Sequence, residues 1–218
     1  MKHLTSALLV FVIILTFSCA QKKDKVRVSG AMVTKDINVS NFHSIGMNVG
    51  AKVFITQGDF KVSAKGKSDL IDLIETDVRK GSWNIEFSKR VSNYEGKLEI
   101  YISMPDVKGI SIAGSGDIIG KSNFDGLGNT SFNINGSGSI SFSGSADKVK
   151  ISIAGSGDMD LVNLKAKDVK VSIAGSGDAN VHASENLKVS IAGSGDVSYK
   201  GSPRVKSSIA GSGDINSI

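Results

Sequence analysis

The sequence predicts an all-β fold, a right-handed parallel β-helix (β-solenoid) with turns of about 18–20 residues and an irregular N-terminal β portion. Two observations predict this fold. The heptapeptide Ser-Ile-Ala-Gly-Ser-Gly-Asp occurs five times between residues 111 and 214, and apolar and polar residues alternate around each copy. Frequent glycine and β-branched residues also disfavour helices. One copy cannot bury its own apolar side, so the copies are expected to stack around a continuous core.

Residues 1–18 are predicted to be a signal peptide. Lys2 and His3 precede an apolar run at residues 7–15, and small residues follow it. The run has nine residues, whereas a membrane-spanning helix needs about 20. The sequence therefore predicts export without a permanent transmembrane helix.

Cys19 follows this run and is the only cysteine of the chain. Residues 15–19 (Leu-Thr-Phe-Ser-Cys) resemble a bacterial lipobox, which implies lipidation of Cys19. Ordinary signal-peptidase cleavage nearby is the alternative. Residues 19–35 are therefore assigned to a lipidated cysteine and a flexible, charged tether. Acyl chains on Cys19 would hold the protein on a membrane, since each buried methylene adds about 0.8 kcal/mol.

Residues 36–218 are predicted to form a single β-solenoid domain, of which residues 36–104 are irregular first turns. Alternating residues predict four strands there, at 52–56, 60–64, 82–87 and 97–102. Residues 68–74 are expected to form a short helix or a capping loop. This part contains Trp83 and is expected to cap one end of the solenoid.

Residues 105–218 contain the Gly-Ser-Gly-Asp repeats. The copies end at positions 117, 139, 158, 178, 196 and 214, at intervals of 22, 19, 20, 18 and 18 residues, and the degenerate second copy ends in Ser139. Apolar residues five, seven and nine positions before the last residue are predicted to face inward. The first glycine of each copy is expected at a bend or at positive φ.

The last residues of the copies are expected to stack into a column of carboxylates: Asp117, Asp158, Asp178, Asp196 and Asp214. Like charges about 5 Å apart repel by roughly 1 kcal/mol in water. We expect each carboxylate to accept amide hydrogen bonds in its turn. A bound Ca²⁺ is the alternative, which the single motif per turn and Ser139 disfavour. No metal or cofactor is predicted.

A lysine column lies eight residues before the aspartates: Lys150, Lys170, Lys188 and Lys206. A basic and an acidic stripe are therefore predicted along one exposed side of the solenoid. The two stripes are candidate binding surfaces, and the basic one would suit anionic glycans or lipid head groups. The alternative is a solvated face that discourages lateral aggregation of the sheet.

Several segments together resemble a known family. They are the repeated Ile-x-Gly-Ser-Gly-Asp, residues 57–59 (Gln-Gly-Asp), residues 70–72 (Leu-Ile-Asp) and residues 104–111 (Met-Pro-Asp-Val-Lys-Gly-Ile-Ser). The chain resembles, over roughly residues 36–216, the putative auto-transporter adhesins of the "head GIN" domain family of Bacteroidetes-type bacteria. The resemblance implies a parallel β-helix and an envelope location, and it implies no catalytic residues.

Charge and composition narrow the function. The formal charge of +5 falls to +4 without the signal peptide, and lysines are interleaved with acids, so no nucleic-acid partner is predicted. His43 and His182 lie far apart in sequence, and no Gly-x-Ser-x-Gly elbow or phosphate loop occurs.

The sequence therefore predicts an envelope-anchored lipoprotein on the outer membrane or cell surface that acts as a non-catalytic binding or structural module, an adhesin. A polysaccharide-processing β-helix enzyme is the alternative. The expected partners are a membrane, reached through the lipid anchor, and a glycan or surface-protein ligand. A homo-oligomer is also expected, because an open solenoid end offers unpaired backbone groups.

Overall fold

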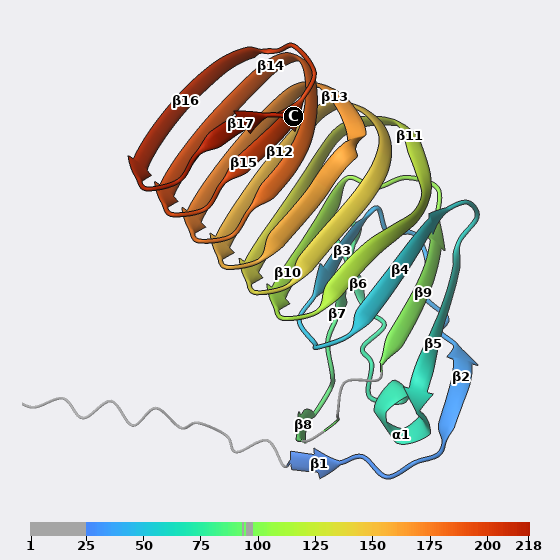
Figure 1. Ribbon diagram of the computed structural model, residues 1–218. Helices are drawn as coiled ribbons and strands as arrows, with labels where there is room; N and C mark the ends of the chain where they lie inside the picture. Colours follow the sequence, from blue (N-terminus) through green and yellow to red (C-terminus); the bar gives the residue numbers. More distant parts are fainter. Residues whose placement is uncertain (1–24, 93, 95–97) are drawn as a thin grey trace, which may run out of the picture.

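The structure is a computed structural model that describes residues 25–92, 94 and 98–218 (Figure 1). The predicted signal peptide and Cys19 lie outside these residues. Within the described part of the chain, no helix has the length and apolar character needed to cross a membrane.

The repeat region is a stack of parallel strands, which confirms the predicted all-β parallel solenoid (Figure 1). Its strands are β10 (Gly109–Gly114), β11 (Asp117–Gly136), β12 (Ser139–Gly155), β13 (Asp158–Gly175), β14 (Ala179–Gly193), β15 (Val197–Lys200), β16 (Arg204–Gly211) and β17 (Ile215–Ser217). The first glycines of the copies pair in register from turn to turn: Gly114, Gly136, Gly155, Gly175, Gly193 and Gly211. The sequence intervals are therefore the lengths of the turns.

The predicted inward columns form the core. In the first five copies, the isoleucines five residues before the end of the copy pair in register and are at most 3% exposed: Ile112, Ile134, Ile153, Ile173 and Ile191. The chain bends sharply after each of them. Gly155 and Gly175, for example, have φ of +125° and +132°, which L side chains rarely adopt. These bends separate consecutive strands of the stack.

The N-terminal turns stack in a different order from the chain. β3 (Ser44–Met47) and β4 (Lys52–Gln57) pair with β10 and β11. The later strands β7 (Ser82–Ile85) and β9 (Glu99–Met104) pair on the outer side of β3 and β4. The chain thus first builds the second layer of the stack and then returns to add the outermost one.

Antiparallel strands cover this end of the stack. β5 (Lys61–Lys67) pairs with β9, β6 (Val78–Arg79) with β7, and β2 (Met32–Asp36) with β5. The predicted short helix is α1 (Ser68–Ile71), and β1 (Lys25–Arg27) and β8 (Arg90–Ser92) form a separate two-stranded sheet. Trp83 is fully buried beside Phe42, with ring centroids 5.5 Å apart.

Part of the predicted tether is ordered as strand. Residues 19–35 were expected to be flexible, yet β1 and β2 lie largely within this range. Met32–Asp36 alternates in exposure and pairs along its whole length with β5, so backbone hydrogen bonds hold it to the sheet.

The opposite end of the stack is open. Among the described residues, β16 pairs with β14 alone, and β17 pairs with β15 alone. Val205 and Ile209 are 40% and 42% exposed, whereas Leu187 and Ile191 one turn earlier are 1% exposed. Inward-facing positions of the last described turn are thus partly in solvent.

Candidate binding site

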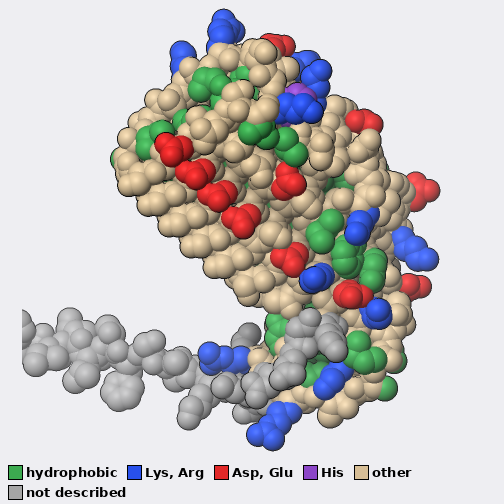
Figure 2. All heavy atoms as spheres, viewed as in Figure 1, with side chains coloured by type: hydrophobic (Ala, Val, Ile, Leu, Met, Phe, Trp, Pro, Cys, Tyr) green, Lys and Arg blue, Asp and Glu red, His purple; other side chains and the backbone are tan. Residues whose placement is uncertain are grey.

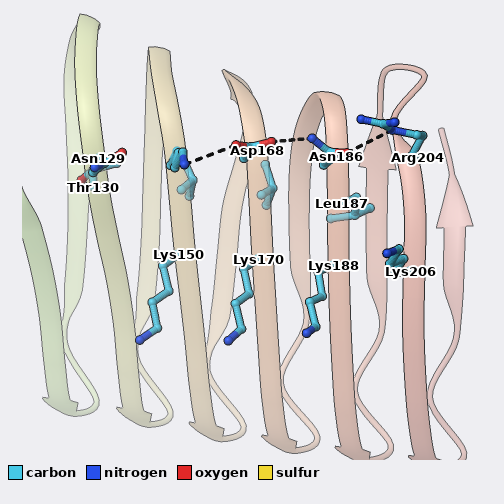
Figure 3. Close-up of a pocket in the computed structure, with 13 residues that line it drawn as sticks. Asn129, Thr130, Lys150, Asp168, Lys170, Asn186, Leu187, Lys188, Arg204 and Lys206 are labelled. Atoms are coloured by element: carbon cyan, nitrogen blue, oxygen red, sulfur yellow. Dashed lines mark hydrogen bonds and ion pairs between the residues drawn. The ribbon is translucent and has the colours of Figure 1, made fainter.

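The predicted lysine column exists as a straight row on the solenoid surface. Lys150, Lys170, Lys188 and Lys206 pair in register and are exposed (Figure 3). Adjacent strands lie about 4.8 Å apart, so the ammonium groups repeat at roughly this spacing. Among the described residues, none of the four forms an ion pair with a carboxylate.

A second column runs beside the lysines, two residues earlier in each turn. Lys148 Nζ lies 3.8 Å from Asp168 Oδ2, and Asn186 Nδ2 donates to Asp168 Oδ1 at 2.7 Å. Arg204 Nε in turn donates to Asn186 Oδ1 at 3.2 Å (Figure 3). These contacts link four turns and hold Asp168 in place. Asp168 is the only carboxylate among the described residues that line the groove presented next.

The two columns border a groove of about 720 Å³. Val149, Val169 and Leu187 also line the groove, between the two columns, and their side chains are buried. The lining contains six Lys or Arg side chains and the single carboxylate of Asp168. The groove is therefore basic, elongated along the solenoid axis and suited to an extended anion.

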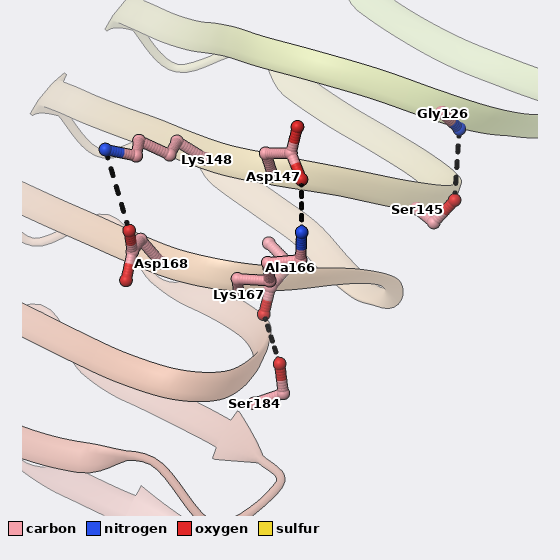
Figure 4. Close-up of polar contacts among 8 residues, drawn as sticks. All are labelled: Gly126, Ser145, Asp147, Lys148, Ala166, Lys167, Asp168 and Ser184. Atoms are coloured by element: carbon pink, nitrogen blue, oxygen red, sulfur yellow. Dashed lines mark hydrogen bonds and ion pairs between the residues drawn. The ribbon is translucent and has the colours of Figure 1, made fainter.

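Some lysines elsewhere on the solenoid do pair with acids. Lys167 Nζ donates to Asp147 Oδ1 at 2.7 Å (Figure 4). This hydrogen bond lowers the pKa of Asp147 and raises the pKa of Lys167. The lack of a carboxylate partner is therefore a feature of the Lys150 column and not of every described lysine.

The aspartate column forms a hydrogen-bonded ladder. Asp178 N donates to Asp158 Oδ1 at 3.4 Å, and Asp196 N donates to Asp178 Oδ1 at 2.8 Å. Asp214 N continues the pattern with Asp196 Oδ1 at 2.8 Å. The predicted amide hydrogen bonds are present, but the donor belongs to the next turn and not to the same turn.

The ladder changes where the degenerate copy interrupts it. Ser139 Oγ donates to Asp117 Oδ1 at 2.7 Å, and Lys52 Nζ lies 4.0 Å from Asp117 Oδ2. No group of three or more His, Cys, Asp or Glu able to hold a metal ion occurs among the described residues. The ladder is explained by its own hydrogen bonds.

The acidic and basic columns do not form one continuous surface, which differs from the predicted arrangement. Lys150 precedes the bend at residues 155–157 and Asp158 follows it, on the next strand. Figure 2 shows a row of acidic side chains along the solenoid without a Lys or Arg row beside it. The bend turns the chain, so the two columns face different directions.

Two surface features were not predicted from the sequence. The column of Lys148, Asp168, Asn186 and Arg204 lies ten residues before the ends of the last four copies, but its residue types differ and no repeat marks it. Phe54 and Tyr101 stack with ring centroids 5.1 Å apart although 47 positions separate them in sequence. The register between β4 and β9 creates that contact.

The family model of the "putative auto-transporter adhesin, head GIN domain" matches residues 41–203. The chain belongs to this family. The match includes Phe54, Tyr101 and most of the lysine column, and ends before Arg204 and Lys206. A comparison with curated proteins found no match.

Solved structures of similar fold are described as putative adhesins or as a putative lipid binding protein. A putative adhesin from Bacteroides fragilis is 25% identical with a TM-score of 0.70, covering 88% of this chain and 100% of that one. A putative lipid binding protein from Parabacteroides distasonis (22% identity, TM-score 0.58) covers 89% of this chain and 100% of its own. A putative adhesin from Parabacteroides merdae (20%, 0.54) covers 89% and 99%. The last two show the fold alone, while the head GIN family and the first support a binding role.

Proposed function

We propose that this protein is an envelope-anchored, non-catalytic binding module that holds an anionic glycan in the groove along the lysine column. The observation that carries the proposal is the register of Lys150, Lys170, Lys188 and Lys206 without carboxylate partners among the described residues. The adhesin description of the family agrees with a binding role.

The spacing of the lysines favours a linear polyanion over a compact one. Ammonium groups repeated at about 4.8 Å can each meet a charge of an extended chain. A small anion would meet one or two of them. The fixed Lys148–Asp168–Asn186–Arg204 column keeps the adjacent wall in place, so little ordering is needed when a ligand binds.

Binding without chemistry is supported by the groove's residues. Glycan cleavage by general acid and base needs two suitably placed ionisable groups. Asp168 is the one carboxylate of the lining, it is held by Asn186 and Lys148, and the lining contains no histidine. The lysine ammonium groups supply attraction to anions and not a paired acid and base.

Anchoring at the outer membrane or cell surface is the second part of the proposal. Cys19 follows a signal-peptide-like run, and the family is described as adhesins. Metabolic labelling with an alkyne fatty acid tests this part. Label should be incorporated into the native chain and lost in Cys19→Ser, and equal labelling of both would contradict lipidation of Cys19.

The glycan part is tested by calorimetric titration of the full chain with polygalacturonate and with a neutral glucan. Lys170→Gln/Lys188→Gln should weaken polygalacturonate binding roughly tenfold, because two exposed ion pairs together contribute about 1–2 kcal/mol. Lys165→Gln/Lys200→Gln is the matched control. It removes the same charge from lysines that do not line the groove.

Equal weakening in both double variants would contradict a groove site, since only net charge would then matter. Equal affinity for the neutral glucan would contradict recognition of charge. Shortened polygalacturonate after incubation would favour the polysaccharide-processing alternative.

A further inference from the structure

We propose a second, separate carbohydrate site on the outer face of β4, β9 and β5, which takes the ring of an acidic sugar unit such as a hexuronic acid. A shallow groove of about 390 Å³ lies there. It shares no lining residue with the groove along the lysine column, which we call the lysine groove. The evidence for the second site is therefore independent of the first. Figure 2 shows hydrophobic side chains grouped with Lys or Arg near the N-terminal turns.

The floor of this groove is a pair of aromatic rings. Phe54 and Tyr101 pair across β4 and β9, and their rings lie 5.1 Å apart with an interplanar angle of 26°. Tyr101 is 40% exposed, which is unusual for so large an aromatic surface in this chain. The stacked pair forms an aromatic surface against which the apolar face of a sugar ring can pack.

The tyrosine ring is held in position before any ligand arrives. Tyr101 Oη donates to Glu99 Oε2 at 2.7 Å, and Lys65 Nζ donates to the same oxygen at 3.3 Å. The Tyr101 hydrogen bond, with the Lys65 hydrogen bond next, lowers the pKa of Glu99 and keeps the carboxylate ionised. Glu99 is thereby engaged and does not line the groove. A pre-positioned ring loses little side-chain entropy on binding.

The rim is basic and rich in hydroxyl groups. Lys121 Nζ lies 4.9 Å from the Phe54 ring centroid, and Lys61 lines the other side. Neither forms an ion pair within the described residues. The remaining polar lining consists of hydroxyl side chains, Thr56, Ser63 and Ser103.

These three features together select the ligand class. The aromatic floor suits a ring with one apolar face, the hydroxyl groups suit its hydroxyls, and the two lysines suit a carboxylate. A lipid chain would leave the hydroxyl rim and the lysines without partners, and burying unpaired polar groups is unfavourable. A neutral sugar would leave the lysines unused. An acidic sugar engages all three features.

The test uses methyl glucuronide and methyl glucoside as probes of the full chain, with binding followed by saturation-transfer NMR. The glucuronide should bind on the order of tenfold more tightly, because a charged hydrogen bond contributes about 1.5 kcal/mol or more. Lys61→Gln/Lys121→Gln should remove this preference. Tyr101→Ala should abolish binding of both sugars.

Tyr101→Phe keeps the stacking ring but loses the hydroxyl that holds it to Glu99, so it should weaken binding far less than Tyr101→Ala does. It should retain binding to within about threefold, the scale of one modest polar contact. Phe54→Leu provides a second test of stacking should Tyr101→Ala fail to fold, and it should also lose binding. Undiminished binding in folded Tyr101→Ala or Phe54→Leu, or no preference for the glucuronide, would overturn the proposal.

The two sites can fail separately. Lys170→Gln/Lys188→Gln should leave methyl glucuronide binding unchanged, and loss of binding in that variant would contradict a separate site. If polygalacturonate still binds to Tyr101→Ala, this result supports the proposed site in the lysine groove and says nothing about the second site.

Discussion

The carboxylate of Asp178 accepts a hydrogen bond from the backbone N–H of Asp196, one turn further along the solenoid, at 2.8 Å. The repeated aspartate is therefore a connection between turns. Each carboxylate is placed on an amide dipole that partly offsets its repulsion from the next carboxylate. The repeat motif thus has a structural explanation, which leaves the lysine column and the aromatic pair as the surfaces to test for binding.

Removing one member of the aspartate ladder should measurably destabilise the fold. Asp178→Ala leaves Asp196 N–H without its acceptor, and we expect a loss of about 1 kcal/mol in the free energy of unfolding. Asp178→Asn keeps an acceptor oxygen and should lose less. Urea unfolding followed by circular dichroism measures both, and equal stability of Asp178→Ala and the native chain would show that the ladder contributes nothing.

Alanine substitutions in the glycine column should separate the destabilisation caused by backbone strain from that caused by steric collision. Gly114→Ala places a residue at φ +125° with nothing within 4 Å of the new Cβ, so strain alone should destabilise by about 1–2 kcal/mol. Gly175→Ala adds a collision with Gly155 O at φ +132° and should destabilise more.

Gly128→Ala is the control for this series, because its Cβ meets nothing within 4 Å and no positive φ is involved. It should be neutral within about 0.5 kcal/mol. Thermal unfolding of the three variants should rank them Gly128, Gly114, Gly175 in increasing loss, and any other order would contradict the explanation.

The lysine column should oppose stability while it supports binding. Lys170→Gln/Lys188→Gln relieves repulsion between like charges and should raise the free energy of unfolding by about 0.5 kcal/mol at low salt. The gain should disappear at about 1 M salt, where screening is strong. A loss of stability at low salt in urea titrations would instead assign these lysines a structural role.

The stability of the protein should depend on pH through Glu99, whose carboxylate holds Tyr101 of the Phe54–Tyr101 pair. Its folded pKa is lowered by Tyr101 and Lys65, so its stabilising contribution is present above the ordinary glutamate pKa and is lost as pH falls through the lowered value. Tyr101→Phe removes the main cause and should raise the Glu99 pKa toward its ordinary value. NMR titration of the Glu99 carboxyl measures this, and an unchanged pKa would contradict the hydrogen bond.

Self-association is expected through the exposed edge of β16. Val205 and Ile209 are partly exposed there, and the outer edge of β16 pairs with no other strand among the described residues. Ile209→Lys should lower any self-association, since it places a charge on an apolar edge. Sedimentation at several concentrations measures it, and a monomer at every concentration would remove the expectation.

The sequence by itself determined the solenoid, its turn lengths and the columns that face inward or outward. Stacking in register aligns the same position of every copy, so the period along the chain becomes the order in space, as the lysine and isoleucine columns show. Local alternation decides which side each residue faces.

Only the tertiary structure decided the features that the spacing of the repeats does not set. The return of β7 and β9 to the outside of β3 and β4 depends on pairing between distant strands, and this pairing places Tyr101 beside Phe54. The bend at residues 155–157 turns the acidic column away from the basic one. Asp168, Asn186 and Arg204 differ in type, so only their aligned register reveals them as one hydrogen-bonded column.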